Sequence, residues 1–460
     1  MPDRTPRMLA LLGVSCRLPY RPVGDRSPRN EVRGRLEGAV LCSDGDRPLP
    51  LRQRTRLSEV PAHSHPGPAM SATTGTRLVA VRRPFDSIDG AVWDALVDRT
   101  PGATPFSRHC VQRAWWDAYG ATAHDQTLVV VDEAAPAAPD AIVGIVPLMH
   151  RHELEPGDVA ARTTIRHQPG CVLRPVPASA TAVFFGASYH ADYATVLAAP
   201  GDLNAVCDAA VASLAAQDAT AWDVLDLRRL REGDPAADAL AKALEWAAPT
   251  AGWVVTREQE DVCPVVTLAP GADFEGFLGT LGKKERHEIR RKVRRAEAAG
   301  EVKLEQSASP IDDLEAFVEL HQKRWGDEGL FPPTEGGAAS RRFFAGLFQN
   351  CAPTGIVELS FLTVAGRRVA AGVTFDDGDT VYYYNAGVEP DARELSPGVV
   401  MVAHYIQRAI ELGRRSVDFL RGDEPYKYEW GAVDSPIERL LVQRTTPVPE
   451  GSGELPAVSS

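Results

Sequence analysis

The chain has 460 residues, of which 44% are hydrophobic and 24% charged, the balance of a globular protein. It is too long for one hydrophobic core, which stops growing near roughly 300 residues, so at least two domains are expected. The formal net charge of −12 gives the chain as a whole no electrostatic footprint for nucleic acid.

Cysteine and histidine patterns bear on metals and on location. Seven Cys are scattered singly, without paired spacing, which disfavours zinc and disulfides and predicts a cytoplasmic protein. The histidines have no carboxylate at metalloenzyme spacing, so we expect no bound metal. No apolar run reaches the roughly 18 residues of a membrane span, so none is expected.

The N-terminal segment differs in composition from the rest. Residues 1–69 hold 12 Arg, no Lys and 7 acidic residues, whereas the remainder is acidic. This composition, without hydrophobic periodicity, predicts an Arg/Pro-rich disordered tail over residues 1–70. Met70 begins MSATTGTRLVAV just ahead of the first expected strand, so the tail is either native or precedes the natural start. A second disordered tail is expected over residues 447–460.

Hydrophobic periodicity divides the ordered sequence into strands and helices. Strands are expected at 78–81, 127–133, 141–151, within 180–199, at 222–230, 264–269, 302–306, three within 356–390, and at 416–422. Helices are expected at 88–98, 109–120, 204–217, 236–248, 274–300 with a break near Gly282, 311–326, 340–352 and 397–413. This order predicts an α/β (α+β) fold with domains at 76–260 and 262–446, each a mixed twisted sheet flanked by helices.

An internal repeat supports that division. The order strand, turn, strand, long strand, Pro-Gly, helix, strand occurs twice, ending first at WDVLDL (222–227) and again at VDFLRG (417–422). Pro200-Gly201 and Pro397-Gly398 occupy the same place in the two copies. Agreement in order, spacing and the Pro-Gly position predicts two lobes that arose by duplication.

The stretch 283–431 resembles the CelD/BioF-like acetyltransferase group of the GNAT superfamily, which is related to the Fem peptidyltransferases. The resemblance rests on KKERHEIRRKVRRAEAAG (283–300), HQKRWG (321–326), RRVAAGVTF (367–375), YYYNAGVEPD (382–391), SPGVVM (396–401) and VDFLRGDEPYKYEWG (417–431). It implies tandem GNAT-like lobes, a degenerate N-terminal one and a C-terminal one that transfers an acyl group to an amine. It also implies acetyl-CoA or another acyl-CoA as donor.

The SPG motif predicts a helix start, because Ser is a common N-cap and Pro suits the first turn. The N–H groups of Gly398 and Val399 would then face an anion that the helix dipole favours. Taken with the resemblance, Ser396, Gly398 and Val399 are candidates for binding the pyrophosphate of the donor. An ordinary capped helix is the alternative.

The resemblance places the strand within 382–390 beside the thioester, splayed from the next strand. The N–H groups of residues 385–388 would then polarise the acyl carbonyl. We assign Asn385 to catalysis and Val388 to cofactor contact, with a plain buried strand as the alternative.

The segment RGDEPYKYEWG (421–431) follows the last strand of the repeat, and strand ends are where sites of α/β folds gather. A solvated loop is the alternative for each residue. The roles we assign are proton acceptor for Asp423, our first choice, or Glu424, thiolate protonation for Tyr426, contact with a phosphate or acceptor carboxylate for Lys427, and acceptor binding for Trp430.

Two further features point to ligands. Arg324 and Trp325 offer a cation with a stacking platform for the acceptor, or else anchor a helix. Residues 283–295 contain eight basic and two acidic residues on an amphipathic helix. Its basic face is either simply solvated or an anion site for cofactor phosphates, a tRNA acceptor stem or an anionic polymer.

Three functions fit these features. The first is an N-acyltransferase that moves an acyl group from acyl-CoA to the amine of a small molecule or of an envelope or natural-product precursor, by direct attack. The second is a Fem-like aminoacyl-tRNA-dependent transferase, in which tRNA is the one nucleic acid expected as a partner. The third is a non-catalytic GNAT-like binding module. The sequence predicts no oligomeric state.

Overall fold

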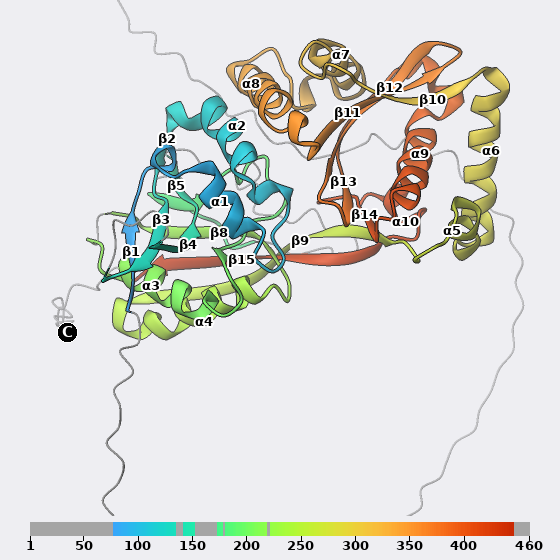
Figure 1. Ribbon diagram of the computed structural model, residues 1–460. Coiled ribbons are helices and arrows are strands. Elements are labelled where there is room, and N and C mark those ends of the chain that lie inside the picture. Colours follow the sequence, from blue (N-terminus) through green and yellow to red (C-terminus); the bar gives the residue numbers. More distant parts are fainter. Residues whose placement is uncertain (1–76, 135–140, 152–172, 178–179, 219–220, 446–460) are drawn as a thin grey trace, which may run out of the picture. The chain divides into compact units, whose positions relative to one another are not determined.

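A computed structural model of the chain describes residues 77–134, 141–151, 173–177, 180–218 and 221–445 (Figure 1). The two tails expected over residues 1–70 and 447–460 lie outside the described residues. The described chain forms two lobes flanked by helices, and one mixed sheet runs through both of them, as the α/β (α+β) expectation allowed.

The first lobe comprises the elements before residue 252. These are β1 Leu78–Arg82, α1 Gly90–Val97, α2 His109–Tyr119, β2 Ala123–Asp125, β3 Leu128–Asp132, β4 Ile142–Val146, β5 Leu148–Arg151, β6 Ala182–Phe185, β7 Leu197–Ala198, α3 Leu203–Ala215, β8 Val224–Arg231 and α4 Pro235–Ala251.

The second lobe comprises the elements between residues 274 and 428. These are α5 Phe274–Thr280, α6 Lys283–Ala299, β10 Val302–Gln306, α7 Leu314–Trp325, α8 Glu335–Asn350, β11 Val357–Val364, β12 Arg367–Asp376, β13 Thr380–Val388, a 3₁₀ segment Pro390–Leu395, α9 Pro397–Glu411, β14 Ser416–Asp418 and α10 Pro425–Tyr428.

Two long strands belong to both lobes, β9 Trp253–Thr267 and β15 Val433–Arg444. They lie at the centre of an eleven-stranded sheet with the order β10-β11-β12-β13-β14-β9-β15-β8-β6-β5-β2. A four-stranded sheet, β1-β3-β4-β7, completes the first lobe. The domain boundary expected at 260–262 therefore falls inside β9, and β15 was not predicted at all.

Local sequence explains where several helices begin. Asp89 accepts hydrogen bonds from the N–H of Ala91 at 2.8 Å and caps α1. Asp273 accepts from the N–H of Gly276 at 2.7 Å and caps α5. The chain turns at Leu281 and Gly282, so α5 and α6 are separate helices. This confirms the break that was expected near Gly282.

Proline changes one expected element. The strand expected over residues 141–151 is divided at Pro147 into β4 and β5, which belong to different sheets. Proline has no N–H to donate to a ladder, so it ends the pairing of β4 with β3 and lets the chain cross to β6.

The repeat appears in the strands that surround α3 and α9. β6 pairs in parallel with β8 through Ala182↔Val224 and Val183↔Leu225, and β13 pairs in parallel with β14. In each lobe the helix that links the parallel pair starts at the Pro-Gly step, with α3 following Pro200-Gly201 and α9 starting at Pro397. The predicted strand–helix–strand unit is thus present twice.

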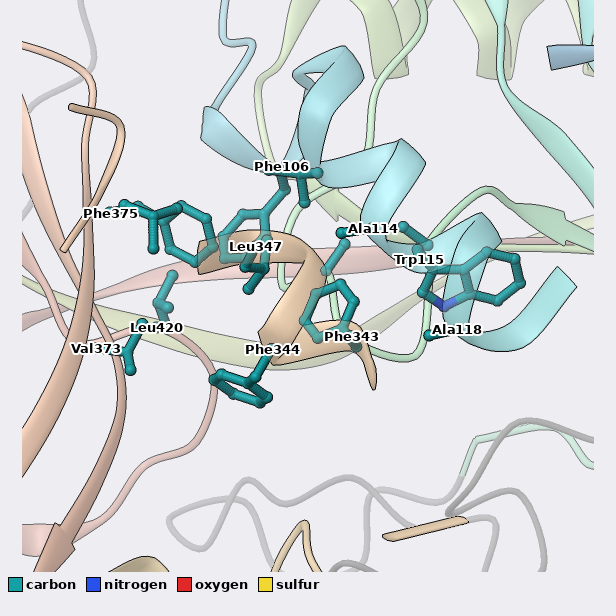
Figure 2. Packing of buried hydrophobic residues seen from close by; sticks show 14 of the residues in the cluster. Phe106, Ala114, Trp115, Ala118, Phe343, Phe344, Leu347, Val373, Phe375 and Leu420 are labelled. Carbon is teal, nitrogen blue, oxygen red and sulfur yellow. The ribbon is translucent and has the colours of Figure 1, made fainter. Parts of the chain in front are cut away.

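One hydrophobic cluster contains residues of both lobes. Gly346 of α8 lies against Ala114 of α2, so closely that a Cβ at Gly346 would meet the Ala114 Cβ at 3.0 Å. Small residues let the two helix backbones approach and the aromatic side chains pack around them. Figure 2 shows the residues that interdigitate, among them Phe106, Trp115, Phe343, Phe344 and Leu347.

Candidate functional site

The strands β13 and β14 pair at one end only. Their ladder has three pairs, from Thr380↔Ser416 to Tyr382↔Asp418. Beyond Asp418 the chain follows β9 instead, with the Phe419 N–H donating to the carbonyl of Pro264 at 3.0 Å and the Gly422 N–H to that of Val262 at 2.9 Å. The rest of β13 stays paired with β12, so the two strands diverge, as the resemblance implied.

The diverging part of β13 presents an edge that we call the open edge, residues 384–388. The register with β12 shifts at Tyr384, an extra residue that makes a β-bulge and bends the strand. The Glu389 N–H donates to the Val369 carbonyl at 2.9 Å. Alternation along an antiparallel ladder then directs the N–H groups of Ala386 and Val388 away from β12, where no described strand pairs with them.

This alternation refines the expectation for residues 385–388. The backbone of Asn385 faces β12 and pairs with Val373, so its N–H does not face the open edge. Val388 does present its N–H there, and Ala386, which was not singled out in the sequence, presents a second one. The bulge at Tyr384 decides which backbone N–H groups of β13 face the open edge. No sequence motif predicts that bulge.

The start of α9 adjoins the open edge. A Cβ on Gly398 would lie 4.0 Å from Cγ1 of Val388. Ser396 is the N-cap of α9, as predicted, but its backbone is left-handed (φ 53°, ψ 52°) and its side chain makes no cap hydrogen bond. Its carbonyl instead accepts from the N–H groups of Val399 at 3.0 Å and Val400 at 3.2 Å. Among the predicted donors, Gly398 is the residue whose N–H has no acceptor in the described chain.

Arg295 of α6 brings a positive charge to the start of α9. Arg295 Nη2 donates to the Ser396 Oγ at 2.7 Å, and its Nε is buried without an acceptor among the described residues. The helices α6 and α9 pack against each other here (Figure 1). The helix start therefore combines a free N–H, a hydroxyl and a guanidinium, a set suited to a phosphate.

The other basic residues of α6 face solvent or acidic partners. Arg290 pairs with Glu275, and Arg291 pairs with Glu288 at 2.7 Å on the exposed side of the helix. Exposed pairs of this kind are worth little to stability. Within the predicted range 283–295, Arg295 is a residue that contacts the start of α9, and sequence reasoning did not single it out.

The segment 421–431 is folded around Lys427. This side chain is 3% exposed, and its Nζ donates to the carbonyls of Leu420 at 2.9 Å, Arg421 at 2.8 Å and Gly422 at 2.8 Å. Glu424 completes its surroundings with an Oε2–Nζ distance of 2.9 Å. The ammonium has no donor left for a phosphate, so Lys427 shapes the loop in place of the ligand contact expected from sequence.

The remaining residues of this segment have mixed exposure. Asp423 is 5% exposed and sits between Gly422, which is bonded to β9, and the start of α10. Tyr426 is half-buried on α10 and packs edge-on against Phe419, with ring centroids 6.1 Å apart. The loop is an ordered part of the second lobe, and the solvated-loop alternative does not describe it.

Helix α7 brings its aromatic end to β13. Trp325 Nε1 donates to the carbonyl of Ala386 at 3.3 Å, and the guanidinium of Arg324 lies 4.4 Å from the centre of the Trp325 ring. Gly387 allows this approach, because a Cβ there would meet the backbone N of His321 at 2.3 Å. The predicted pair therefore lies beside the open edge, and it anchors α7 as well.

His321 is a neighbour of the site that the sequence reasoning missed. Burial lowers its pKa to about 3, helped by the nearby charge of Arg324 and opposed by a side-chain hydrogen bond with Asn385. The imidazole is therefore neutral at physiological pH and too weak a base to take a proton from an amine. The HQKRWG motif held the signal, since His321 lies one helical turn before Trp325.

Trp430 does not lie in an open position. It is 2% exposed and packs in the second-lobe core, on one side of a cavity of about 250 Å³. That cavity lies between the α5–α6 corner and the end of the predicted segment, and its lining includes Phe277, Glu285, Tyr428, Glu429 and Trp430. A contact between Trp430 and an acceptor would have to occur through this cavity.

Within the described ranges, no group of three or more His, Cys, Asp or Glu side chains is placed to hold a metal ion. None of the helices in that part of the chain combines the length and apolarity needed to cross a membrane.

Comparison with known proteins shows what the second lobe is similar to. Residues 283–428 match the family model described as an acetyltransferase (GNAT) domain. No curated protein matches the chain in sequence. The crystal structure of FemX aligns with 78% of this chain and 96% of its own, at 11% identity and a TM-score of 0.50. A tandem GNAT protein from the clavulanic acid biosynthesis pathway aligns with 80% and 99%, at 10% identity and a TM-score of 0.43.

Proposed function

We propose, starting from the GNAT acyltransferase domain that residues 283–428 form, that the second lobe moves an acyl group from acyl-CoA to an amine. One observation carries the choice of donor. The open edge of β13 adjoins the start of α9, where Arg295 and the Gly398 N–H converge. A thioester and the diphosphate of its carrier would be held by these two adjoining features.

The donor is proposed to bind in a fixed direction. Its phosphates would meet the Gly398 N–H, the Ser396 hydroxyl and the Arg295 guanidinium. Its acyl carbonyl would accept hydrogen bonds from the N–H groups of Ala386 and Val388. Donors fixed by a strand need little reorganisation when negative charge develops on the carbonyl oxygen, so they favour the tetrahedral transition state.

The chemistry is a direct displacement. The amine nitrogen forms a bond to the acyl carbon while the carbon–sulfur bond breaks, and one proton passes from the amine to the departing thiolate overall. We assign Asp423 to accept the proton of the amine, with Glu424 as the second choice, and Tyr426 to protonate the thiolate. Both carboxyls lie in the loop that follows β14, on the other side of the divergence from β13.

The acceptor is proposed to be an amine of a small molecule or of an envelope or natural-product precursor. Trp325, beside the carbonyl of Ala386, offers a flat surface close to the site of attack, and Arg324 stacked on it offers a positive charge. An acceptor that carries a carboxylate or phosphate near its amine would use both. The enzyme is proposed to act in the cytoplasm.

The donor site can be tested with two neighbouring arginines of α6. Arg295→Gln should weaken acetyl-CoA binding about tenfold, because a charged hydrogen bond to phosphate is lost. Arg294→Gln removes the same charge from an exposed position, where Nε donates to the carbonyl of Arg290 at 3.3 Å, and should leave the affinity unchanged. Isothermal titration with acetyl-CoA measures both variants against the wild type.

An aminoacyl-tRNA is the competing donor, and the exposed basic face of α6 next to Ser396 is the observation in its favour. The same titration separates the two. Failure of the wild-type chain to bind acetyl-CoA at millimolar concentration would overturn the acyl-CoA assignment. Equal weakening by Arg294→Gln and Arg295→Gln would mean that the general charge of α6 matters, as a polyanion requires.

A further inference from the structure

A short segment of the first lobe reaches the second-lobe site at three points. We call residues 187–193 the bridging segment. Its His190 contacts Tyr384, Tyr193 donates to Asp418 Oδ2 at 2.7 Å, and Asp192 pairs with the Arg421 Nε at 3.3 Å. These partners are the bulge residue of β13, the last residue of β14 and the loop after β14. The bridging segment therefore contacts both strands where β13 and β14 separate.

The contact of His190 with the bulge is twofold. Tyr384 donates its hydroxyl hydrogen to the carbonyl of His190 at 3.0 Å, and the Nδ1 of His190 lies 3.1 Å from the same hydroxyl oxygen. When the Tyr384 hydroxyl donates to that carbonyl, Nδ1–H donates to the hydroxyl oxygen and Nε2 is an acceptor. The same distances allow the hydroxyl to donate to Nδ1, with the proton on Nε2.

The other nitrogen has a partner in either tautomer. Tyr119 Oη lies 2.7 Å from His190 Nε2 and 3.1 Å from Ser340 Oγ of α8. With Nδ1 protonated, the Tyr119 hydroxyl donates to Nε2 and accepts from Ser340, whereas with Nε2 protonated these two hydrogen bonds run the other way. A network in which each member is satisfied holds its side chains in a single arrangement.

Packing fixes the imidazole as firmly as its hydrogen bonds do. His190 is 4% exposed and stacks on Phe343 of α8, with ring centroids 4.0 Å apart and an interplanar angle of 12°. The first lobe therefore holds Tyr384 by hydrogen bonds from His190, whose ring is fixed by stacking on Phe343. Since Tyr384 is the extra residue of the bulge, these hydrogen bonds hold the bend of β13 at the start of the open edge.

We propose that His190 of the first lobe is a positioning residue for acyl transfer, because its hydrogen bonds to Tyr384 hold the β13 bulge so that the Ala386 and Val388 N–H groups face the acyl carbonyl. The inference rests on the function proposed above. It gives the first lobe a part in catalysis that needs no contact with the donor. A displacement of about 1 Å at such a site can cost roughly a hundredfold in rate.

The test reads the carbonyl directly, so it needs no knowledge of the acceptor. Isotope-edited infrared spectra of carbonyl-¹³C acetyl-CoA bound to the full chain report how strongly the protein polarises the thioester. The wild type should shift the carbonyl stretch to lower frequency. Tyr384→Phe, which deletes only the hydroxyl, and His190→Phe, which keeps a ring on Phe343, should each lose most of that shift. Both should bind acetyl-CoA within about twofold of the wild type, since the phosphate contacts remain.

Tyr119→Phe is the matched control, because it removes a hydroxyl from the same imidazole on the side away from β13. It should retain most of the shift, and His190→Asn, whose side-chain N–H can reach the place of Nδ1–H, should recover part of it. Thermal melting checks that each variant is folded, and Tyr384→Phe carries the test if His190→Phe is not.

The outcomes separate the two proposals. Folded Tyr384→Phe that binds acetyl-CoA and keeps the full wild-type shift would overturn the positioning role while leaving the acyltransferase in place. A wild type that binds acetyl-CoA without shifting its carbonyl stretch would overturn both the open-edge assignment and this inference. A wild type that does not bind acetyl-CoA would overturn the donor itself, and the positioning role with it.

Discussion

In the first lobe, backbone donors between β6 and α3 are satisfied by the protein itself. The Ala194 N–H donates to the carbonyl of Arg229 at 2.9 Å, and the Ala198 N–H donates to the Thr100 hydroxyl at 3.0 Å. In the second lobe, the N–H groups of Ala386 and Val388 face an edge where no described strand pairs with them. Two lobes with the same strand–helix–strand unit thus differ in whether these backbone donors have partners among the described residues.

Side chains also fill the space beside the first-lobe segment. Side chains of the first lobe, including Phe106, Tyr193 and Thr195, close around a cavity of about 10 Å³, enough for about one water molecule. In the second lobe, the chain after β14 moves away along β9. The first lobe then contributes Tyr193 and His190 to its neighbour, so the copy without an open edge supports the copy that has one.

The acidic residue after the parallel strand has also taken different roles. In the first lobe, Asp234 precedes Pro235, accepts from the Ala236 N–H at 3.1 Å as the cap of α4, and accepts the Thr195 hydroxyl at 2.9 Å. In the second lobe, Asp423 and Glu424 precede Pro425, and Glu424 makes no side-chain cap of α10. Asp234 of the first lobe therefore caps a helix, a role that Glu424 of the second lobe does not have.

The largest loss of turnover should come from Asp423 of the second lobe, and Asp234 of the first lobe serves as its control. Asp423→Asn should lower turnover about 10²–10⁴-fold, because the proposed proton acceptor is lost, with little change in acetyl-CoA affinity. Thiol release from acetyl-CoA with a panel of primary amines measures turnover, and titration measures affinity.

Asp234→Ala is the control in the other lobe. It should cost about 1–2 kcal/mol of stability through the lost cap of α4 while turnover stays within a few-fold of the wild type. Normal turnover by Asp423→Asn would remove Asp423 from the mechanism and leave Glu424 as the candidate base.

The next largest effect should come from the open edge. Val388→Pro deletes one N–H that faces away from β12, so it should cost no ladder hydrogen bond. The expected loss in turnover is about 10²–10³-fold, the usual cost of removing one donor to a developing oxyanion. Melting temperature and CoA affinity should change little by comparison. A variant that melts far below the wild type would show that the Val388 N–H belongs to the ladder.

The fold could be predicted from sequence where the pattern is local. The helix expected at 109–120 is α2, and the break at Gly282 separates α5 from α6. Strand β15 was missed because its pattern depends on a distant partner. Arg439, 1% exposed, lies on that strand and is bound to Asp226 of β8 by Nη2–Oδ2 and Nε–Oδ1 distances of 2.9 and 2.5 Å. From sequence alone an arginine is expected to face solvent, so a buried arginine is not predicted until its charged partner is known.

The candidate site was predictable to the level of motifs. The resemblance located the strand at 382–390, the SPG step and the loop at 421–431, all of which belong to the second lobe. It could not choose between Asn385 and Ala386, since the choice follows from the bulge at Tyr384. It could not find His190 either, because a contact across 194 positions of sequence leaves no local signal.

The smallest expected effect concerns the joint between the lobes at Asp418. Burial raises the pKa of this carboxyl to about 6, despite hydrogen bonds from Tyr193 and the Leu420 N–H and the charges of Arg231 and Lys427. A raised pKa means that the folded state holds the proton more tightly than the unfolded state, whose value is near 3.8. The resulting stability is complete below about pH 4 and is lost as pH rises through 6.

Asp418→Asn should remove that dependence. An amide can accept from the Leu420 N–H and donate to the Tyr193 oxygen, so it fits the site without a charge. The difference in unfolding free energy between wild type and variant should therefore move by up to roughly 3 kcal/mol in favour of the variant between pH 4 and pH 7. Urea titrations of both chains across this range measure it, and comparing the two cancels the titration of other groups. If the difference instead stays constant, the carboxyl titrates alike in the folded and unfolded chain, and the contact between Tyr193 and Asp418 is open to water.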